Sequence, residues 1–203
     1  MLPGCHSALL AVTLLASCAS TTFESTWKAP DVGPLDYTGK KVAAVFVSAQ
    51  EGTRRVAEDT LAREISERGA QGVAAYTLIS LEELKDEKSA RAKLQQAGCA
   101  GAVMMRVTST EKEIHATPAT WSGARYSSFS HYSGYGWGTV YEPGYLSTDT
   151  IVSIETLVYS LEKDKLIWAG ISKTFNPSKT ASFVEELADA AAAEMKEAGV
   201  IRR

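Results

Sequence analysis

Lys41-Val42-Ala43-Ala44-Val45-Phe46-Val47 is the stretch that decides the fold, because it is apolar without a break from Val42 onward. A strand with one face in water alternates apolar and polar residues, whereas a strand buried on both faces reads as a continuous apolar run. A helical pattern follows over residues 53–68, with a candidate N-cap at Thr53 and a stop at Gly69. A buried strand followed directly by a helix predicts the start of a parallel β-α-β core.

The same alternation continues along the chain. Residues 73–79 and 102–107 predict two further strands, the second of which continues towards Glu113. The helical stretch between them opens on the capping box Ser80-Leu81-Glu82-Glu83 and ends at Gly98. A hairpin is predicted over 150–161 and 166–171, and a last helix over 182–198. The order β-α-β-α-β-(insert)-β-β-α predicts an α/β (α+β) fold with a single mixed sheet.

The N-terminus carries a membrane address. A short apolar run ends in Leu15-Ala16-Ser17-Cys18, which resembles a bacterial lipobox and implies a signal peptide over residues 1–17 and a lipid on Cys18. Ser20 stands where an Asp would retain such a protein in the inner membrane, so the resemblance favours the outer membrane, facing the periplasm. Residues 1–7 lack the basic residues of a secretory signal. An ordinary signal peptide or a buried N-terminal helix therefore remains the alternative.

The mature chain predicts one domain on a short tether. Residues 18–38 are rich in Ser, Thr, Pro and Gly and predict a lipidated tether, although Trp27 and Tyr37 indicate that part of it lies on the domain. Residues 39–203 then form a single domain. A net charge of −3 gives no sign of nucleic-acid binding. Cys99, the one cysteine left besides Cys18 after signal removal, is expected to be a small buried packing residue.

An insert at 121–145 holds nearly half of the aromatic residues of the chain, with glycines between them. Tyr, Ser and Gly together are typical of antibody paratopes, where rigid rings supply contact area and small residues supply adaptability. We expect the partner contacts to be Tyr132, Tyr135, Trp137 and Tyr141. The alternative is that the rings fold onto their own sheet.

Arg54-Arg55-Val56-Ala57-Glu58-Asp59 places two cations four residues before two anions on the first helix. The plain interpretation is a solvated face of i, i+4 ion pairs. The functional interpretation is a charged docking surface, with Arg54 and Arg55 as partner contacts, beside the end of the first strand, where open α/β sheets bind ligands.

Catalytic and metal-binding patterns give no further signal. His115 and His131 are the histidines of the mature chain, and neither stands in an HxH, HExxH or CxxC spacing. The sequence therefore predicts no metal, no cofactor and no catalytic residue.

Several short matches point to a known family. They are Trp27 before Pro30, the strand from Lys41, Arg54-Arg55 with Glu58-Asp59, Ala75-Tyr76, Gly98, and Leu166-Ile167-Trp168-Ala169-Gly170. On these residues the chain, over roughly 24–201, resembles a family of proteobacterial lipoproteins whose domain is similar to the TolB N-terminal domain and to the CsgG and LpoB cores. In that group TolB joins an envelope complex, LpoB activates a peptidoglycan synthase and CsgG forms a secretion pore. The resemblance brings no catalytic residue with it.

Taken together, these features predict a non-enzymatic lipoprotein of the outer membrane that binds an envelope protein or a second copy of itself. Two alternatives stay open: an oligomeric secretion pore like CsgG, and an envelope hydrolase. The insert argues against the pore, because it places Gly and Ser where a membrane strand needs recurrent lipid-facing side chains.

Overall fold

The computed structural model describes residues 21–117, 120–122, 140–142 and 145–201, and its centre is a six-stranded sheet in the order β1-β8-β7-β4-β2-β3. The strands are β1 (Thr21–Lys28), β2 (Lys41–Val47), β3 (Gln71–Ala74), β4 (Cys99–Thr117), β7 (Tyr145–Ser160) and β8 (Lys165–Phe175). The helices are α1 (Glu51–Glu67), α2 (Leu81–Leu84), α3 (Glu87–Gln96) and α5 (Thr180–Glu197), with a 3₁₀ turn η1 (Ala75–Thr77).

The sheet is mixed, as the sequence predicts. Strands β3, β2 and β4 run parallel, and β7, β8 and β1 add antiparallel pairings on the other side of β4. The continuous apolar run of β2 is explained by its place between β3 and β4 with a helix layer on each face. Val42, Ala43, Ala44 and Val45 are all 3% exposed or less.

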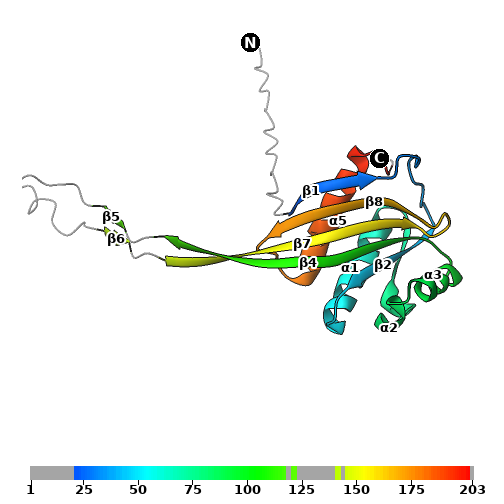
Figure 1. Cartoon of the computed structure of the whole chain (residues 1–203), viewed down its shortest axis with the longest axis horizontal. Helices are drawn as coiled ribbons and strands as arrows, with labels where there is room; N and C mark the ends of the chain where they lie inside the picture. The colour runs from blue at the N-terminus through cyan, green and yellow to red at the C-terminus, as the bar shows by residue number, and fades with distance from the viewer. Residues whose placement is uncertain (1–20, 118–119, 123–139, 143–144, 202–203) are drawn as a thin grey trace, which may run out of the picture.

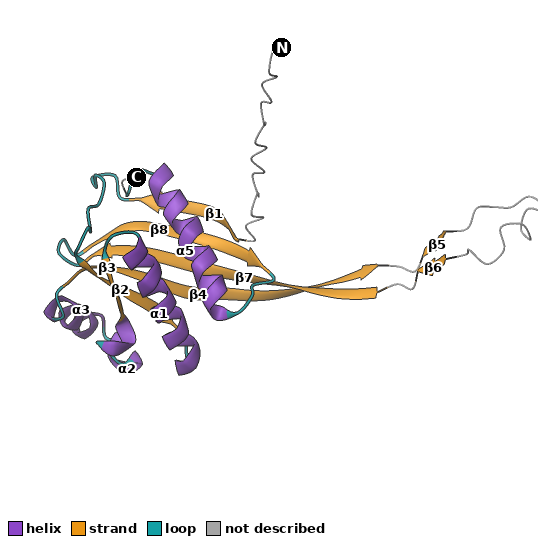
Figure 2. Ribbon diagram, turned by 180° about the vertical axis from the view of Figure 1, so that it is seen from behind, coloured by secondary structure: helices purple, strands orange, loops and turns teal. Residues whose placement is uncertain are grey.

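Two helix layers of unequal width cover the sheet (Figures 1 and 2). Helices α1 and α5 lie side by side over one face, where Leu61 and Leu187 pack against Phe46, Met105 and other strand residues. Helix α3 covers the opposite face over β2 and β4 through Ala90 and Leu94. The sequence places Val184, Leu187, Ala188, Ala191 and Met195 on one side of the last helix; the first four are buried and Met195 is partly buried.

Helix and strand ends agree with the sequence in part. The capping box at Ser80 and Glu83 forms, and Gly69 has a φ of +93° as the helix stop requires. Helix α1 begins at Glu51, so Thr53 lies in its first turn and is not the N-cap. The second predicted strand, 73–79, is too long. The strand ends at Ala74 and the chain turns into η1, where its backbone bonds to α1 instead of to a strand.

The segment predicted as a tether contains a strand. Residues 21–28 form β1, which pairs with β8 and makes the edge of the sheet. Phe23 packs edge-to-face on Trp168 with ring centroids 5.6 Å apart, and Ala29 and Val32 are buried. A run of Ser, Thr and Glu at a sheet edge carries little apolar signal, because only one of its faces is covered. The tether interpretation for 18–38 therefore overlaps the folded sheet from Thr21 onward.

Strands β4 and β7 are longer than predicted and leave the domain as a two-stranded ribbon (Figure 1). They pair without a break from Ser109↔Ser153 to Thr117↔Tyr145. We call residues 113–117 of β4 together with 145–149 of β7 the arm. A short second sheet follows, in which β5 (Thr120–Ser122) pairs with β6 (Val140–Glu142).

Candidate functional site

Arg54 is not part of a solvated face. It is 2% exposed and Glu58 is 0% exposed, and the Arg54 Nε lies 2.9 Å from the Glu58 Oε1. The interpretation of this pair as an exposed i, i+4 ion pair is wrong. Both residues lie on the face of α1 that also carries Ala57 and Leu61, and this face packs against the sheet. The two charged side chains are therefore buried together with the apolar residues of the helix.

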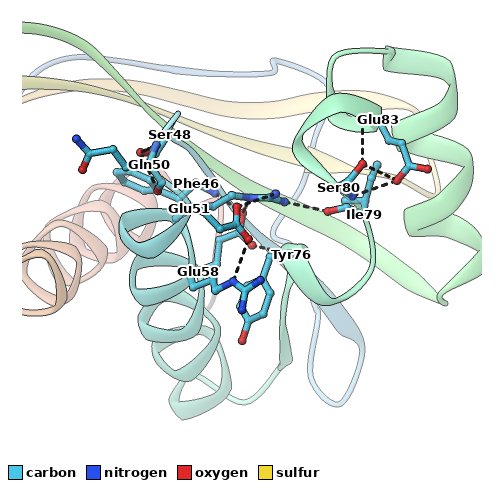
Figure 3. A network of polar contacts seen from close by, with 11 residues as sticks. Phe46, Ser48, Gln50, Glu51, Glu58, Tyr76, Ile79, Ser80 and Glu83 are labelled. Carbon is cyan, nitrogen blue, oxygen red and sulfur yellow. Dashed lines mark hydrogen bonds and ion pairs between the residues drawn. The ribbon is translucent and has the colours of Figure 1, made fainter.

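Glu58 is the centre of a buried network at the carboxyl end of β2 (Figure 3). Its Oε1 accepts hydrogen bonds from the Phe46 N–H at 3.1 Å and from Arg54, and its Oε2 accepts one from the Tyr76 N–H. Arg54 Nη2 donates to the Ile79 carbonyl at 3.0 Å. One carboxylate thus holds together the end of β2, helix α1 and η1.

Two opposing effects act on the Glu58 carboxyl. Burial is the larger effect and raises the pKa of Glu58 above its ordinary value, whereas the hydrogen bonds from Phe46, Arg54 and Tyr76 act to lower it. Because the carboxylate is fully buried and both of its oxygens accept hydrogen bonds, we assign the network a structural role: it fixes the geometry of this end of the sheet.

Arg55, unlike its neighbour Arg54, reaches the surface. Its Nε lies 2.9 Å from the Glu51 Oε1, and its guanidinium lies over the Tyr76 ring at 5.2 Å from the centroid. Asp59, the partner predicted for Arg55, accepts a hydrogen bond from the Tyr76 hydroxyl at 3.0 Å, and this bond raises the pKa of Tyr76. Arg55, Tyr76 and Asp59 therefore form an exposed polar cluster beside the Glu58 network.

The arm is the second candidate site, and its edges are open. Strand β2 ends opposite Arg106 and β8 ends opposite Ile151, so beyond these points neither β4 nor β7 has another strand neighbour within the described residues. Asn176, the residue after β8, binds β7 at the base of the arm. Its side chain donates to the Asp149 carboxylate at 2.9 Å and accepts from the Thr150 N–H at 2.8 Å. Further out, Ile114 is 70% exposed.

Three of the six residues that the sequence proposes as partner contacts lie outside the described part of the chain. This holds for Tyr132, Tyr135 and Trp137, and also for the lipidation residue Cys18. Tyr141 lies in β6, paired with Trp121. Thr117, the last residue of β4, and Tyr145, the first of β7, pair at the far end of the arm. The sequence predicts only the beginning of the arm, because it extends one strand towards Glu113 and starts the next at Thr150, whereas the pairing continues to Thr117 and Tyr145.

A cavity of about 620 Å³ lies at the opposite end of the sheet, between the ends of α1 and α5 and residues 35–38. Its walls include Val42, Val103 and Ile201. Arg68 at its rim is already paired with Glu64 at 2.9 Å and with Asp189. The cavity contains none of the predicted contact residues.

Cys99 is buried as expected, and burial raises the pKa of its thiol. Within the described ranges no group of three or more His, Cys, Asp or Glu side chains is arranged to hold a metal ion. No described helix is long and apolar enough to cross a membrane.

No protein-family model matches the chain, and no curated protein matches it. The resemblance to TolB, CsgG and LpoB therefore stays a prediction. Among solved structures, the PelC dodecamer from Paraburkholderia phytofirmans is similar, with a TM-score of 0.46, 10% identity, and coverage of 88% of this chain and 99% of that one. The lipoprotein GNA1162 from Neisseria meningitidis is also similar, with a TM-score of 0.40, 13% identity, and coverage of 78% and 99%.

Proposed function

We propose that this chain is a non-enzymatic lipoprotein, anchored in the outer membrane through Cys18 and facing the periplasm, whose arm binds an envelope protein. The observation that carries the proposal is the arm itself. A domain that needs only to fold has no use for two strands that continue past their neighbours on both sides.

The backbone of the arm provides the chemistry of binding. Each open edge presents N–H and C=O groups that no described strand pairs with, and such edges are templates for the addition of another strand. A two-stranded ribbon alone in water is marginally stable. A partner that adds a strand would satisfy the edge groups and stabilise the ribbon together.

The aromatic insert belongs to the same proposal. It follows the arm in the chain, so we propose Tyr132, Tyr135, Trp137 and Tyr141 as further contacts of the same partner. Interface hot spots are enriched in Trp and Tyr. Of the two arginines predicted as contacts, Arg55 on the surface keeps this role in the proposal, because Arg54 is enclosed.

A second copy of the chain is the alternative partner, favoured by the same open edges, because identical arms can pair with one another. We expect a monomer or a small assembly and no pore. The enzyme alternative has no support from any described cluster of catalytic side chains.

In-cell photocrosslinking tests the proposal. A photoreactive residue at Lys112, exposed at the base of the arm, should crosslink a defined envelope protein, whereas one at the exposed Lys85, the C-cap of α2, should not. Replacing 118–144 by Asn-Gly closes the paired ends Thr117 and Tyr145 with a hairpin turn. That variant should unfold cooperatively and lose most of the crosslinks.

The outcomes separate the alternatives. Crosslinks only between copies would replace the envelope partner by self-association. Equal crosslinking from positions 112 and 85 would refute the arm as the site. For the anchor, Cys18→Ala should abolish palmitate labelling and release the protein from membranes. Turnover of peptidoglycan fragments or esters by the purified chain would overturn the non-enzymatic assignment.

A further inference from the structure

We infer that the open face of the sheet over β7, β8 and β1 rests on the lipid surface of the membrane that holds the anchor. This inference rests on the proposed lipidation of Cys18. It assigns a membrane-docking role to residues that neither the fold nor the arm explains.

The open face carries large exposed apolar side chains beside its polar ones, where a solvent-facing sheet normally carries polar residues. In β8 the side chains alternate, and Trp168, Ser172 and Thr174 are buried beneath the helix layer of α1 and α5. The alternate positions, Ile171 and Phe175, point to the opposite face and are 40% and 48% exposed. Figure 1 shows β1, β8 and β7 toward the viewer with α5 behind them.

Neighbouring strands extend the same apolar surface. Trp27 of β1 lies opposite Ala169, which in turn lies opposite Leu157 of β7. Trp27 is 48% exposed. Helix α3 covers the corresponding face only over β2 and β4. Within the described residues no helix covers it over β7, β8 and β1, although antiparallel sheets that face water normally carry polar residues there.

The position of β1 brings this face to the membrane. Cys18 lies three residues before Thr21, and a chain of three residues spans at most about 11 Å. The first residue of β1 therefore cannot stand further than this from the lipidated cysteine. Phe175 follows Thr174, the residue that pairs with Thr21, so the apolar face begins at the anchored end of β1.

Charge and residue type indicate how the face meets the lipid. Two ion pairs lie on it: Lys173 with Glu24 at 2.8 Å, and Arg106 with Glu155 at 2.6 Å. On the same side of the sheet, Glu111 and Glu113 of β4 add negative charge near Lys173. A face without net positive charge is not drawn to anionic lipid, so its contact with the membrane is apolar. Tryptophan is enriched at the membrane–water interface, where its ring is amphipathic.

Depth-dependent quenching tests the inference. The lipidated full chain, in a Cys99→Ala background, is reconstituted in vesicles of phosphatidylethanolamine and phosphatidylglycerol at 3:1. An environment-sensitive fluorophore is attached at Ile171→Cys or, as a matched control, at Val56→Cys. Val56 is an apolar residue of α1 that is 45% exposed.

We expect nitroxide-labelled lipids to quench the fluorophore at 171 at least threefold more than the one at 56. The difference should persist in high salt and in vesicles of phosphatidylethanolamine and phosphatidylcholine. Adding Trp27→Gln and Phe175→Gln should reduce quenching at 171 while the protein still floats with the vesicles.

Equal quenching at 171 and 56 on floating protein would overturn the inference and leave the anchor intact. Loss of floating would instead refute the lipidation. If position 171 is shielded in envelope preparations but not in vesicles, the face is a protein interface and the inference is wrong.

Discussion

Glu58 is a buried acidic residue. Its carboxylate is fully enclosed and is held by Phe46, Arg54 and Tyr76. Removing one partner of a buried ion pair leaves the other charge uncompensated, which is far more costly than losing an exposed pair. At the residue scale the network is therefore the most sensitive point of the fold.

Glu58→Gln should lower the free energy of unfolding by about 3–5 kcal/mol, because an NH₂ group replaces one of the two accepting oxygens and Arg54 loses its buried anion. The exposed Glu51, 4.0 Å from Arg54, then remains its only ion-pair partner among the described residues. Urea unfolding followed by circular dichroism measures the loss. The control is Arg55→Gln, whose partner Glu51 is exposed and whose effect should be small. Equal urea midpoints for the two variants would show that the buried network contributes no more to stability than an exposed ion pair.

At the scale of single elements, α2 depends on its cap. Ser80 accepts from the Glu83 N–H, and the Glu83 carboxylate accepts from the Ser80 N–H at 3.1 Å and from Lys93. The hydrogen bond from Lys93 and those from Ser80 lower the pKa of Glu83 to about 2, from an ordinary value of 4.5.

The unfolded chain therefore binds more protons than the folded one between pH 4.5 and about 2, and the contribution of Glu83 is lost as the pH falls through that window. Glu83→Gln should make the urea midpoint less dependent on pH below 4.5. Glu82→Gln, which removes an exposed partner of Lys85, should not. A carboxyl NMR titration of Glu83 with an ordinary midpoint would contradict this.

The open edges of the arm predict that its amides exchange faster than those of the central sheet. Without a partner, the amides of 114–117 should exchange with deuterium at least tenfold faster than those of 101–106, which lie between two strands. Asn176 has a φ of +48°, so Asn176→Gly keeps the backbone conformation and removes only the side-chain hydrogen bonds to Asp149 and Thr150. That variant should speed exchange further at the base. Uniform protection along β4 would show that the ribbon is stable alone.

At the scale of the whole molecule, β1 closes the sheet. It covers the edge of β8 and brings Phe23 onto Trp168, and its Thr21 N–H donates to Glu186 of α5 at 2.7 Å. Gly170 makes this close contact feasible, because a Cβ there would lie 2.6 Å from the Phe23 ring. The N-terminal segment is therefore part of the domain.

A chain of residues 29–203 should lose about 3 kcal/mol or more of unfolding free energy compared with residues 21–203, since a buried aromatic contact and a strand are removed together. Size-exclusion chromatography should also show association through the bared edge of β8. Equal urea midpoints for the two chains would show that the segment is a tether after all.

The sequence by itself determined the mixed sheet and the order of its main elements from β2 onward. The uninterrupted apolar run at 42–47, the helical stripe ending at Leu187 and Ala191, and the cap at Ser80 are local or periodic signals, and each kept its meaning in the fold. The burial of Cys99 follows from the same kind of signal, a small residue among small residues.

Tertiary structure decided the rest, because partners distant in the chain set it. The spacing of Arg54 and Glu58 in the sequence suggests an ion pair at the surface. In the fold the end of β2 and the segment around η1 bury both residues. The polar strand β1 is a strand only because β8 offers an edge, and the arm extends because β4 and β7 pair beyond their neighbours. The apolar open face exists only once three strands are aligned in register, which no single stretch of sequence encodes.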